Sequence, residues 1–246
     1  MHRRRLLISV GLVLGFVALV LAGLVAAVKR VPSFYTQAEM PEGLVREENS
    51  RQATARFFQI RSSLQRDEPS WDLSLSGQQL NAYFQQDYYE HGGDNNLPDG
   101  FSAPRVKFED GRMRLGMRYG RGWLSTILSI EIKAWLIPGE TNMMAMEIVS
   151  LKAGALPLSP ATLLDDISEA VRRENVDITW YRNEGHPVAV MRFQADLTRP
   201  TMQFDRLELT DESMTIAGRS VDFVTATGPQ APAVTMGPMP RVVSGP

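Results

Sequence analysis

The chain has no cysteine and only three histidines among its 246 residues. The absence of cysteine excludes disulfides, thiol catalysis and zinc sites built on thiolates. His2, His91 and His186 lie far apart in the sequence, so a histidine-rich metal site is not expected. The short motifs of serine hydrolases, zinc proteases and phosphate-binding loops are also missing. We therefore expect no enzymatic activity, no cofactor and no metal ion.

Basic residues are scarce in most of the chain and concentrated at its start. The first 30 residues contain five basic residues and no acid, whereas the rest of the chain has 21 basic and 28 acidic residues. Binding to nucleic acid needs clustered Lys and Arg. The acidic body therefore argues against nucleic acid as a partner, and also against broad electrostatic adhesion to anionic lipid.

A long uncharged run follows the basic N-terminus. The run from Leu6 to Val28 contains 23 residues. At about 1.5 Å of rise per residue, a helix of this length crosses the ~30 Å hydrocarbon core of a bilayer. We predict a basic N-terminus at residues 1–5 and a single transmembrane helix at residues 6–28. The segment Val25–Ala27, with small residues at −3 and −1, would also suit a signal peptide cleaved after Ala27, but the run is longer than a usual signal core. We favour an uncleaved signal-anchor.

The charges on either side of this helix predict its orientation. Arg3, Arg4 and Arg5 precede it, and Lys29 and Arg30 follow it. The denser positive charge favours the cytoplasmic side. We therefore predict a single-pass protein of the bacterial inner (cytoplasmic) membrane, with its C-terminal domain outside the cytoplasm in the cell envelope. The aromatic pair just after the helix, Phe34–Tyr35, is expected at the membrane interface.

The remaining sequence predicts one extracytoplasmic α+β domain at residues 33–227. Helical apolar spacing and alternating patterns occur in turn, which favours a curved antiparallel sheet with two or three helices packed on one face. Ser76 and Gln79 have the spacing of a capping box. The Pro-rich residues 228–246 are expected to form a disordered tail. We expect helices at about 41–65, from 76 onward and at 159–173, and strands at 71–75, 112–119, 123–137, 143–151, 178–181, 188–195, 203–209 and 213–217.

Three short motifs carry a resemblance to a known family. They are Val31–Phe34 directly after the apolar run, Leu75–Asn81 at a helix start, and Gly154–Pro160 between a strand and a helix. In this order they resemble the YpmS-like membrane-anchored proteins of bacteria. The resemblance implies an anchored extracytoplasmic domain related to lipid-binding folds, and it carries over no catalytic residue. The longer helix at 41–65 and the Pro-rich tail depart from that family.

Two polar clusters have residue types that could carry chemistry. Tyr88–His91 with Asp94–Asn96 offers oxygen ligands for a cation, but the spacing does not match a calcium loop, so an exposed turn is favoured. Asp165, Asp166 and Glu169 could act as paired carboxylates, but with Arg172 and Arg173 they have the spacing of ion pairs on a solvated helix face. Glu131 and Lys133 fall on the polar side of their strand and are expected to face water.

The methionines give the most specific hypothesis about a ligand. Met113, Met117, Met143, Met144 and Met146 fall on two or three neighbouring strands. Flexible thioether side chains adapt to irregular apolar shapes, so they suit a groove for acyl chains or for a partner helix. They could equally pack the sheet against helices. We take Met113, Met117, Met144 and Met146 as candidates for a ligand groove.

Two functions are compatible with these patterns. The first is a membrane-anchored extracytoplasmic domain that binds lipid or another apolar ligand. The second is a membrane-anchored scaffold that binds other envelope proteins, in part through the tail after Gly228, without a small-molecule ligand. An apolar cavity near the methionines would favour the first of these.

Overall fold

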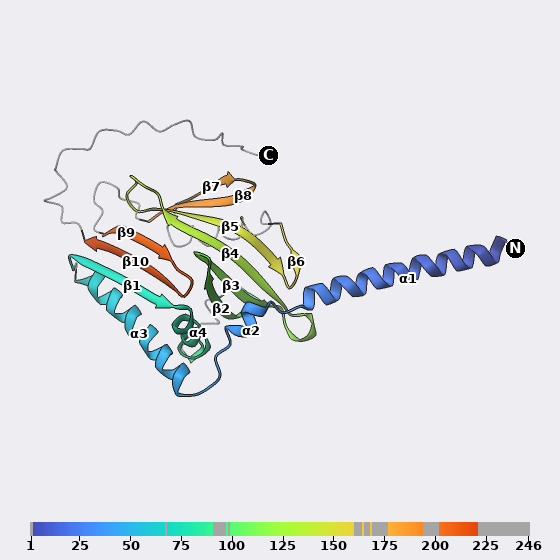
Figure 1. Ribbon diagram of the computed structural model, residues 1–246, viewed down its shortest axis with the longest axis horizontal. Coiled ribbons are helices and arrows are strands. Elements are labelled where there is room, and N and C mark those ends of the chain that lie inside the picture. Colours follow the sequence, from blue (N-terminus) through green and yellow to red (C-terminus); the bar gives the residue numbers. More distant parts are fainter. Residues whose placement is uncertain are drawn as a thin grey trace.

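The computed structural model describes residues 2–66, 68–90, 97, 99–159, 164, 168, 177–193 and 202–220. Several predictions fall outside these residues. They are the candidate cation-binding residues Asp94–Asn96, the helix at 159–173 apart from residues 159, 164 and 168, and the tail at 228–246. The carboxylates Asp165, Asp166 and Glu169 also lie there. Within the described residues the fold is α+β with antiparallel strands and an apolar helix at its N-terminus, as predicted (Figure 1).

Helix α1 (His2–Lys29) projects away from the rest of the molecule (Figure 1). Its side chains from Leu14 to Ala26 are exposed, whereas Ala27, Val28 and Lys29 are half-buried. Counted from Leu14, this is the one stretch among the described residues that is long and apolar enough to cross a membrane. An apolar helix that no other described residue covers is not the core helix of a soluble fold.

Four further helices with described bounds precede or follow the first strand. Helix α2 (Ser33–Gln37) begins after Pro32, whose backbone is extended, and a loop then leads to α3 (Leu44–Gln65). Helix α4 (Gly77–Gln85) begins with the predicted capping box, since Ser76 Oγ accepts from Gln79 N and Ser76 N donates to Gln79 Oε1. A short turn of helix, α5 (Asp87–Glu90), follows.

The strands form two antiparallel sheets instead of the single sheet that we expected. The smaller sheet has three strands in the order β1 (Ser70–Ser76), β10 (Ser213–Ser220) and β9 (Met202–Leu209). The larger sheet has seven strands, with β6 (Leu156–Pro157) paired to β5 alone. The order of its other strands is β2 (Phe101–Glu109), β3 (Arg112–Tyr119), β4 (Thr126–Leu136), β5 (Met143–Ala153), β8 (His186–Arg192) and β7 (Asp177–Asn183).

Strand β2 and the start of β4 were not predicted correctly. Pro104 interrupts the β pattern of β2, yet it is tolerated because β2 is an edge strand. Strand β4 begins at Thr126, three residues later than expected. A single 3-10 turn, Gly122–Leu124, comes before it because Gly120 and Gly122 adopt positive φ angles.

The two sheets are joined by a core and by one buried polar residue. Asn142 is only 2% exposed; its Nδ2 donates to Met202 O, and its Oδ1 accepts from Phe204 N. These bonds hold β9 against the turn between β4 and β5. The main core contains Ala53, Leu75, Leu80, Val106 and Phe108, and it brings α3 and α4 onto β1 and β2.

The two faces of the larger sheet differ in character. On β3 and β4 one face contacts α2, and we call it the α2 face; the other is the core face. Phe34 and Tyr35 pack on the α2 face beside Ile127, and a Cβ on Gly116 would lie only 2.7 Å from Tyr35 Cδ2. The expectation that Phe34 and Tyr35 sit at the membrane interface is therefore wrong, because Gly116 leaves room for both rings against the sheet.

Candidate functional site

The end of α1 is fixed to the larger sheet by hydrogen bonds. Ala155 N donates to Ala27 O at 2.8 Å, Thr126 Oγ1 donates to Val28 O at 2.6 Å, and Lys29 Nζ donates to Ser125 O at 2.9 Å. The last carbonyl groups of a helix have no partner within the helix. The starts of β4 and β6 supply donors to two of them, so α1 leaves the domain from a defined position.

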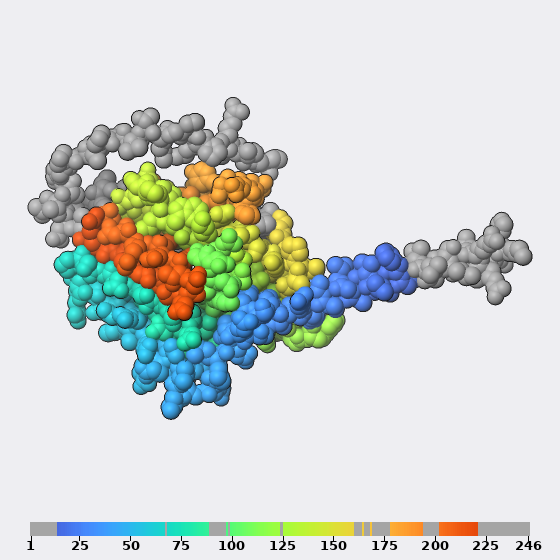
Figure 2. Space-filling view, viewed as in Figure 1, coloured from blue at the N-terminus to red at the C-terminus, as the bar shows by residue number. Residues whose placement is uncertain are grey.

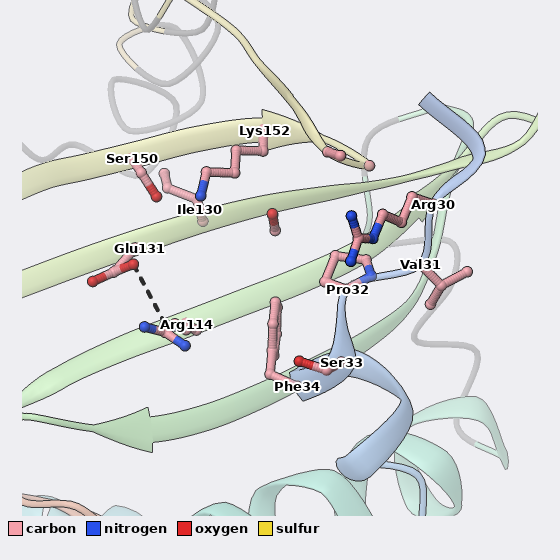
Figure 3. A pocket seen from close by; sticks show the side chains of 13 residues that line it. Arg30, Val31, Pro32, Ser33, Phe34, Arg114, Ile130, Glu131, Ser150 and Lys152 are labelled. Atoms are coloured by element: carbon pink, nitrogen blue, oxygen red, sulfur yellow. Dashed lines mark ion pairs between the residues drawn. The ribbon is translucent and has the colours of Figure 1, made fainter. Parts of the chain in front are cut away.

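A pocket lies directly beside this attachment. It is enclosed by the segment Arg30–Phe34 on one side and by the α2 face of β3, β4 and β5 on the other (Figure 3). Its volume of about 420 Å³ lies within the ~300–1,000 Å³ of small-molecule sites. Ser33, Ser129 and Ser150 line it with hydroxyl groups. We call it the helix-foot pocket.

Three cations from three different segments border the helix-foot pocket. Arg30 follows α1, Arg114 lies on β3, and Lys152 lies on β5, and Figure 3 shows their side chains around the same space. Glu131 is the one carboxylate among the described residues that line it. The balance of charge in the pocket is therefore positive, although the body of the protein is acidic.

Glu131 is already engaged by a chain of ion pairs on the α2 face. Arg112 Nη1 donates to Glu131 Oε1 at 2.8 Å, and Arg114 Nε lies 3.4 Å from Glu131 Oε2. Arg114 also lies 2.7 Å from Glu109, which in turn accepts from Lys107 at 3.1 Å. Glu131 thus does not simply face water as expected, because the pairing of β3 with β4 places Arg112 and Arg114 of β3 beside it.

These ion pairs change the pKa values of their members. The pKa of the Glu109 carboxyl is lowered from its ordinary value of 4.5 by the hydrogen bond from Lys107, then by the charge of Lys107, then by that of Arg114. The pKa of the Arg112 guanidinium is raised by its hydrogen bond to Glu131 and by the charge of that carboxylate. Both shifts favour the charged forms that hold the chain together.

Arg30 and Lys152 stand apart from this chain. Both are exposed, and no ion pair joins either of them to another described residue. Arg114, by contrast, is held between Glu109 and Glu131. Arg30 and Lys152 are therefore the two cations of the helix-foot pocket that are free to bind an anion from outside the protein.

The four candidate methionines share one face of the sheet but do not line this pocket. The strand register places Met113, Met117, Met144 and Met146 all on the core face, with β4 between the two pairs. Met113 packs against the main core. Neither the helix-foot pocket nor a second pocket of about 590 Å³ contains any of the four. Their role in a ligand groove stays a prediction.

The second pocket lies on the other side of α2 and has a mixed lining. Glu39, Asp211 and Glu212 border it together with Lys107, and the start of α4 closes one side. Its carboxylates outnumber its cations, so it does not select anions. It has no contact with α1.

Other polar groups give weaker candidates. His186 Nδ1 lies 2.8 Å from Glu147 Oε1 on the α2 face, away from both pockets. No group of three or more His, Asp or Glu among the described residues has the geometry to hold a metal ion.

The cations of the helix-foot pocket were not identified as a site from the sequence. The sequence analysis interprets Arg30 only as a flank of the membrane helix. Arg114 falls within the strand expected at 112–119, and Lys152 lies one residue beyond the strand expected at 143–151. One signal was present, because Gly154 and Val31–Phe34 belong to the short motifs and also line the pocket. No family model, no curated protein and no solved structure matches the chain.

Proposed function

We propose that this protein is a single-pass membrane protein whose domain binds the phosphate-bearing headgroup of an anionic lipid in the helix-foot pocket, without catalysing a reaction on it. One observation carries the proposal: two cations that form no ion pair with another described residue, Arg30 and Lys152, border a pocket at the foot of an apolar helix. A phosphate group accepts strong, charge-assisted hydrogen bonds from such side chains.

The lining of the pocket suits a headgroup better than an acyl chain. Ser33, Ser129 and Ser150 add hydroxyl donors to the two free cations. Arg114 contributes positive charge while Glu109 and Glu131 hold it in place. Since Arg30 directly follows α1, a lipid can place its headgroup here while its acyl chains stay in the bilayer next to the helix. The apolar ligand expected from the methionines is thus replaced by an amphiphile held through its polar end.

The attachment of α1 favours an anchor that is retained. Cleavage after Ala27 would remove the carbonyl group to which Ala155 N donates. One of the hydrogen bonds that fix α1 beside the pocket would then be lost. Arg3–Arg5 before the helix favour a domain outside the cytoplasm. The proposal is therefore a retained signal-anchor with the pocket at the outer surface of the bacterial inner membrane.

Native mass spectrometry of the full chain, released from nanodiscs, tests the proposal. In nanodiscs of phosphatidylcholine mixed with phosphatidylglycerol, we expect phosphatidylglycerol to stay bound to the protein. The double variant R30Q/K152Q should bind it at least about tenfold more weakly, since a hydrogen bond to a charged group contributes ~1.5–3 kcal/mol. Unchanged retention in this variant would refute the proposed site.

Two controls separate the pocket from general charge effects and from free phosphate. The variant K133Q/R206Q removes the same charge from exposed positions outside the pocket and should retain the lipid as the parent chain does. Inorganic phosphate and glycerol 3-phosphate are added as competitors. Displacement of the lipid by inorganic phosphate alone would mean that the ligand is a free anion and would contradict lipid binding.

A further inference from the structure

Several exposed apolar side chains of the domain lie around the end of α1. Val31 is 47% exposed, Tyr119 46%, Trp123 78% and Leu158 38%. Val31 is two residues beyond α1, and Leu158 is three residues beyond Ala155, which is bonded to α1. Tyr119 lies opposite Thr126, the residue that donates to Val28 O. Among the described residues, half of the large apolar side chains that are exposed outside α1 thus belong to this rim.

Trp123 is the most prominent member of the rim. It lies in the 3-10 turn Gly122–Leu124, two residues after the exposed Arg121. Lys29 Nζ, at the last residue of α1, lies 5.8 Å from the centre of its ring. Trp123 therefore lies beside the last residue of α1.

The attachment of α1 fixes where these side chains point. Three hydrogen bonds hold Ala27, Val28 and Lys29 to the starts of β4 and β6. The turn between β3 and β4 and the strand β6 lie on either side of α1 where it joins the domain (Figures 1 and 2). If α1 crosses a bilayer, the rim meets the surface of that same bilayer.

We propose that the turn Gly120–Ser125 is a second membrane contact, in which Trp123 inserts into the headgroup layer beside α1. Trp has an apolar ring and a polar N–H, and together with Lys and Arg it is favoured at this depth. Arg121 and Lys29 supply cations for lipid phosphates. With two contacts, the domain lies against the bilayer at a fixed angle, and the helix-foot pocket stays at headgroup height. The inference rests on α1 as the membrane anchor and does not depend on what the pocket binds.

The absence of cysteine makes this contact directly measurable by site-directed spin labelling. Trp123→Cys is compared with Glu140→Cys in the full chain, reconstituted in phosphatidylcholine vesicles. Glu140 is exposed in the turn at the far end of β4, roughly 35 Å away at about 3.3 Å per strand residue. Collision rates with oxygen, which concentrates in lipid, and with a nickel chelate, which stays in water, report the surroundings of each label.

We expect the ratio of oxygen to nickel collisions at position 123 to exceed that at position 140 several-fold. Equal ratios would overturn the proposal, because position 123 would then be in water. Protection of position 123 from both reagents would also overturn it, because a protein surface would then cover the turn. Vesicles that fail to retain the chain would instead refute α1 as the anchor.

Fluorescence of the unlabelled chain provides an independent check. Trp71 is 6% exposed, and Trp135 and Trp180 are also partly covered by the domain, so Trp123 is the tryptophan that lipid can reach. Brominated phosphatidylcholine should quench part of the emission of the parent chain. That quenched part should be lost in Trp123→Phe. Quenching of the same size in both proteins would contradict insertion of Trp123.

Discussion

The charged residues on the α2 face form a chain of ion pairs in which Glu109, Arg114 and Glu131 each have two partners of opposite charge. Glu109 contacts Arg114 at 2.7 Å, yet Arg114 is also engaged by Glu131. Lys107 contacts Glu109 at 3.1 Å and pairs with no other described carboxylate. Lys107 lowers the pKa of Glu109 through its hydrogen bond and then through its charge, and the charge of Arg114 lowers it less.

Titration of Glu109 by NMR tests this order. We expect the pKa of Glu109 in the full chain to lie below 4.5, and Lys107→Met to raise it more than Arg114→Met does. Because the pKa is lowered in the folded protein, the ion pair stabilises the fold above the ordinary Glu pKa. This stabilisation is lost as the pH falls through the lowered value. A larger effect of Arg114→Met, or a pKa at or above 4.5, would contradict the order.

At the scale of secondary structure, one amide side chain joins α4 to β2 in addition to their contacts in the main core. Asn81 Nδ2 donates to Val106 O at 2.7 Å, and Asn81 Oδ1 accepts from Val106 N at 2.8 Å. Strand β2 is an edge strand, so the outward-facing backbone groups of Val106 have no neighbouring strand to bond. The Leu75–Asn81 motif thus ends strand β1, caps helix α4 and bonds the open edge of β2. All three roles are structural.

Asn81→Ala should destabilise the domain by roughly 2–5 kcal/mol, because it leaves the buried N–H and C=O of Val106 unpaired at ~1–3 kcal/mol each. Asn49→Ala is the matched control, since Asn49 Nδ2 bonds only to Val45 O on the exposed surface of α3. We expect that control to change stability by less than ~0.5 kcal/mol. Denaturant unfolding of the full chain in mild detergent, followed by tryptophan fluorescence, measures both. Equal losses of unfolding free energy in the two variants would show that the bonds from Asn81 to the edge strand β2 do not stabilise the domain.

The sequence predicted elements whose pattern is local. The capping box of α4 and the bounds of β3 were correct because Ser76, Gln79 and the alternation at 112–119 specify them within a few residues. The ion-pair chain and the helix-foot pocket were not predicted, because they depend on cross-strand register. Arg114 meets Glu131 only through the pairing of β3 with β4, and Lys152 joins the same face only through β5.

At the scale of the whole molecule, the strands from both ends of the domain meet in the smaller sheet. Strand β1 pairs with β10, and Ser74 Oγ lies 3.0 Å from Thr215 Oγ1 although the two residues are far apart in the sequence. Alternation within one strand shows that it is half-buried, but not which distant strand it joins. For this reason the α+β class was predictable from the sequence, and the division into two sheets was not.

The position of the domain relative to α1 depends on one glycine. Gly154 has a φ of +58°, and a Cβ added to it would lie 2.6 Å from Ala27 O and in contact with Val28 O as well. Only a residue without a side chain lets Ala155 N reach Ala27 O at 2.8 Å. The Gly154–Pro160 motif is thus placed where the membrane helix meets the sheet, and its first residue sets how closely they approach.

Gly154→Ala should loosen the domain on its anchor without unfolding it. Spin labels at Leu21→Cys in α1 and Glu140→Cys in the domain report their separation by pulsed EPR in vesicles. We expect a narrow distance distribution in the otherwise native chain and a clearly broader one with Gly154→Ala, since the last turn of α1 must move away from the added methyl group.

Gly185→Ala is the matched control, because Gly185 has a φ of +89° but open space where a Cβ would lie. Both substitutions place Ala in a left-handed conformation at a cost of about 1–2 kcal/mol, so only the steric effect on α1 differs. Equal widths in the two variants would mean that the domain is not held by the Gly154 contact, and the depth of Trp123 would then have to be set by the turn alone.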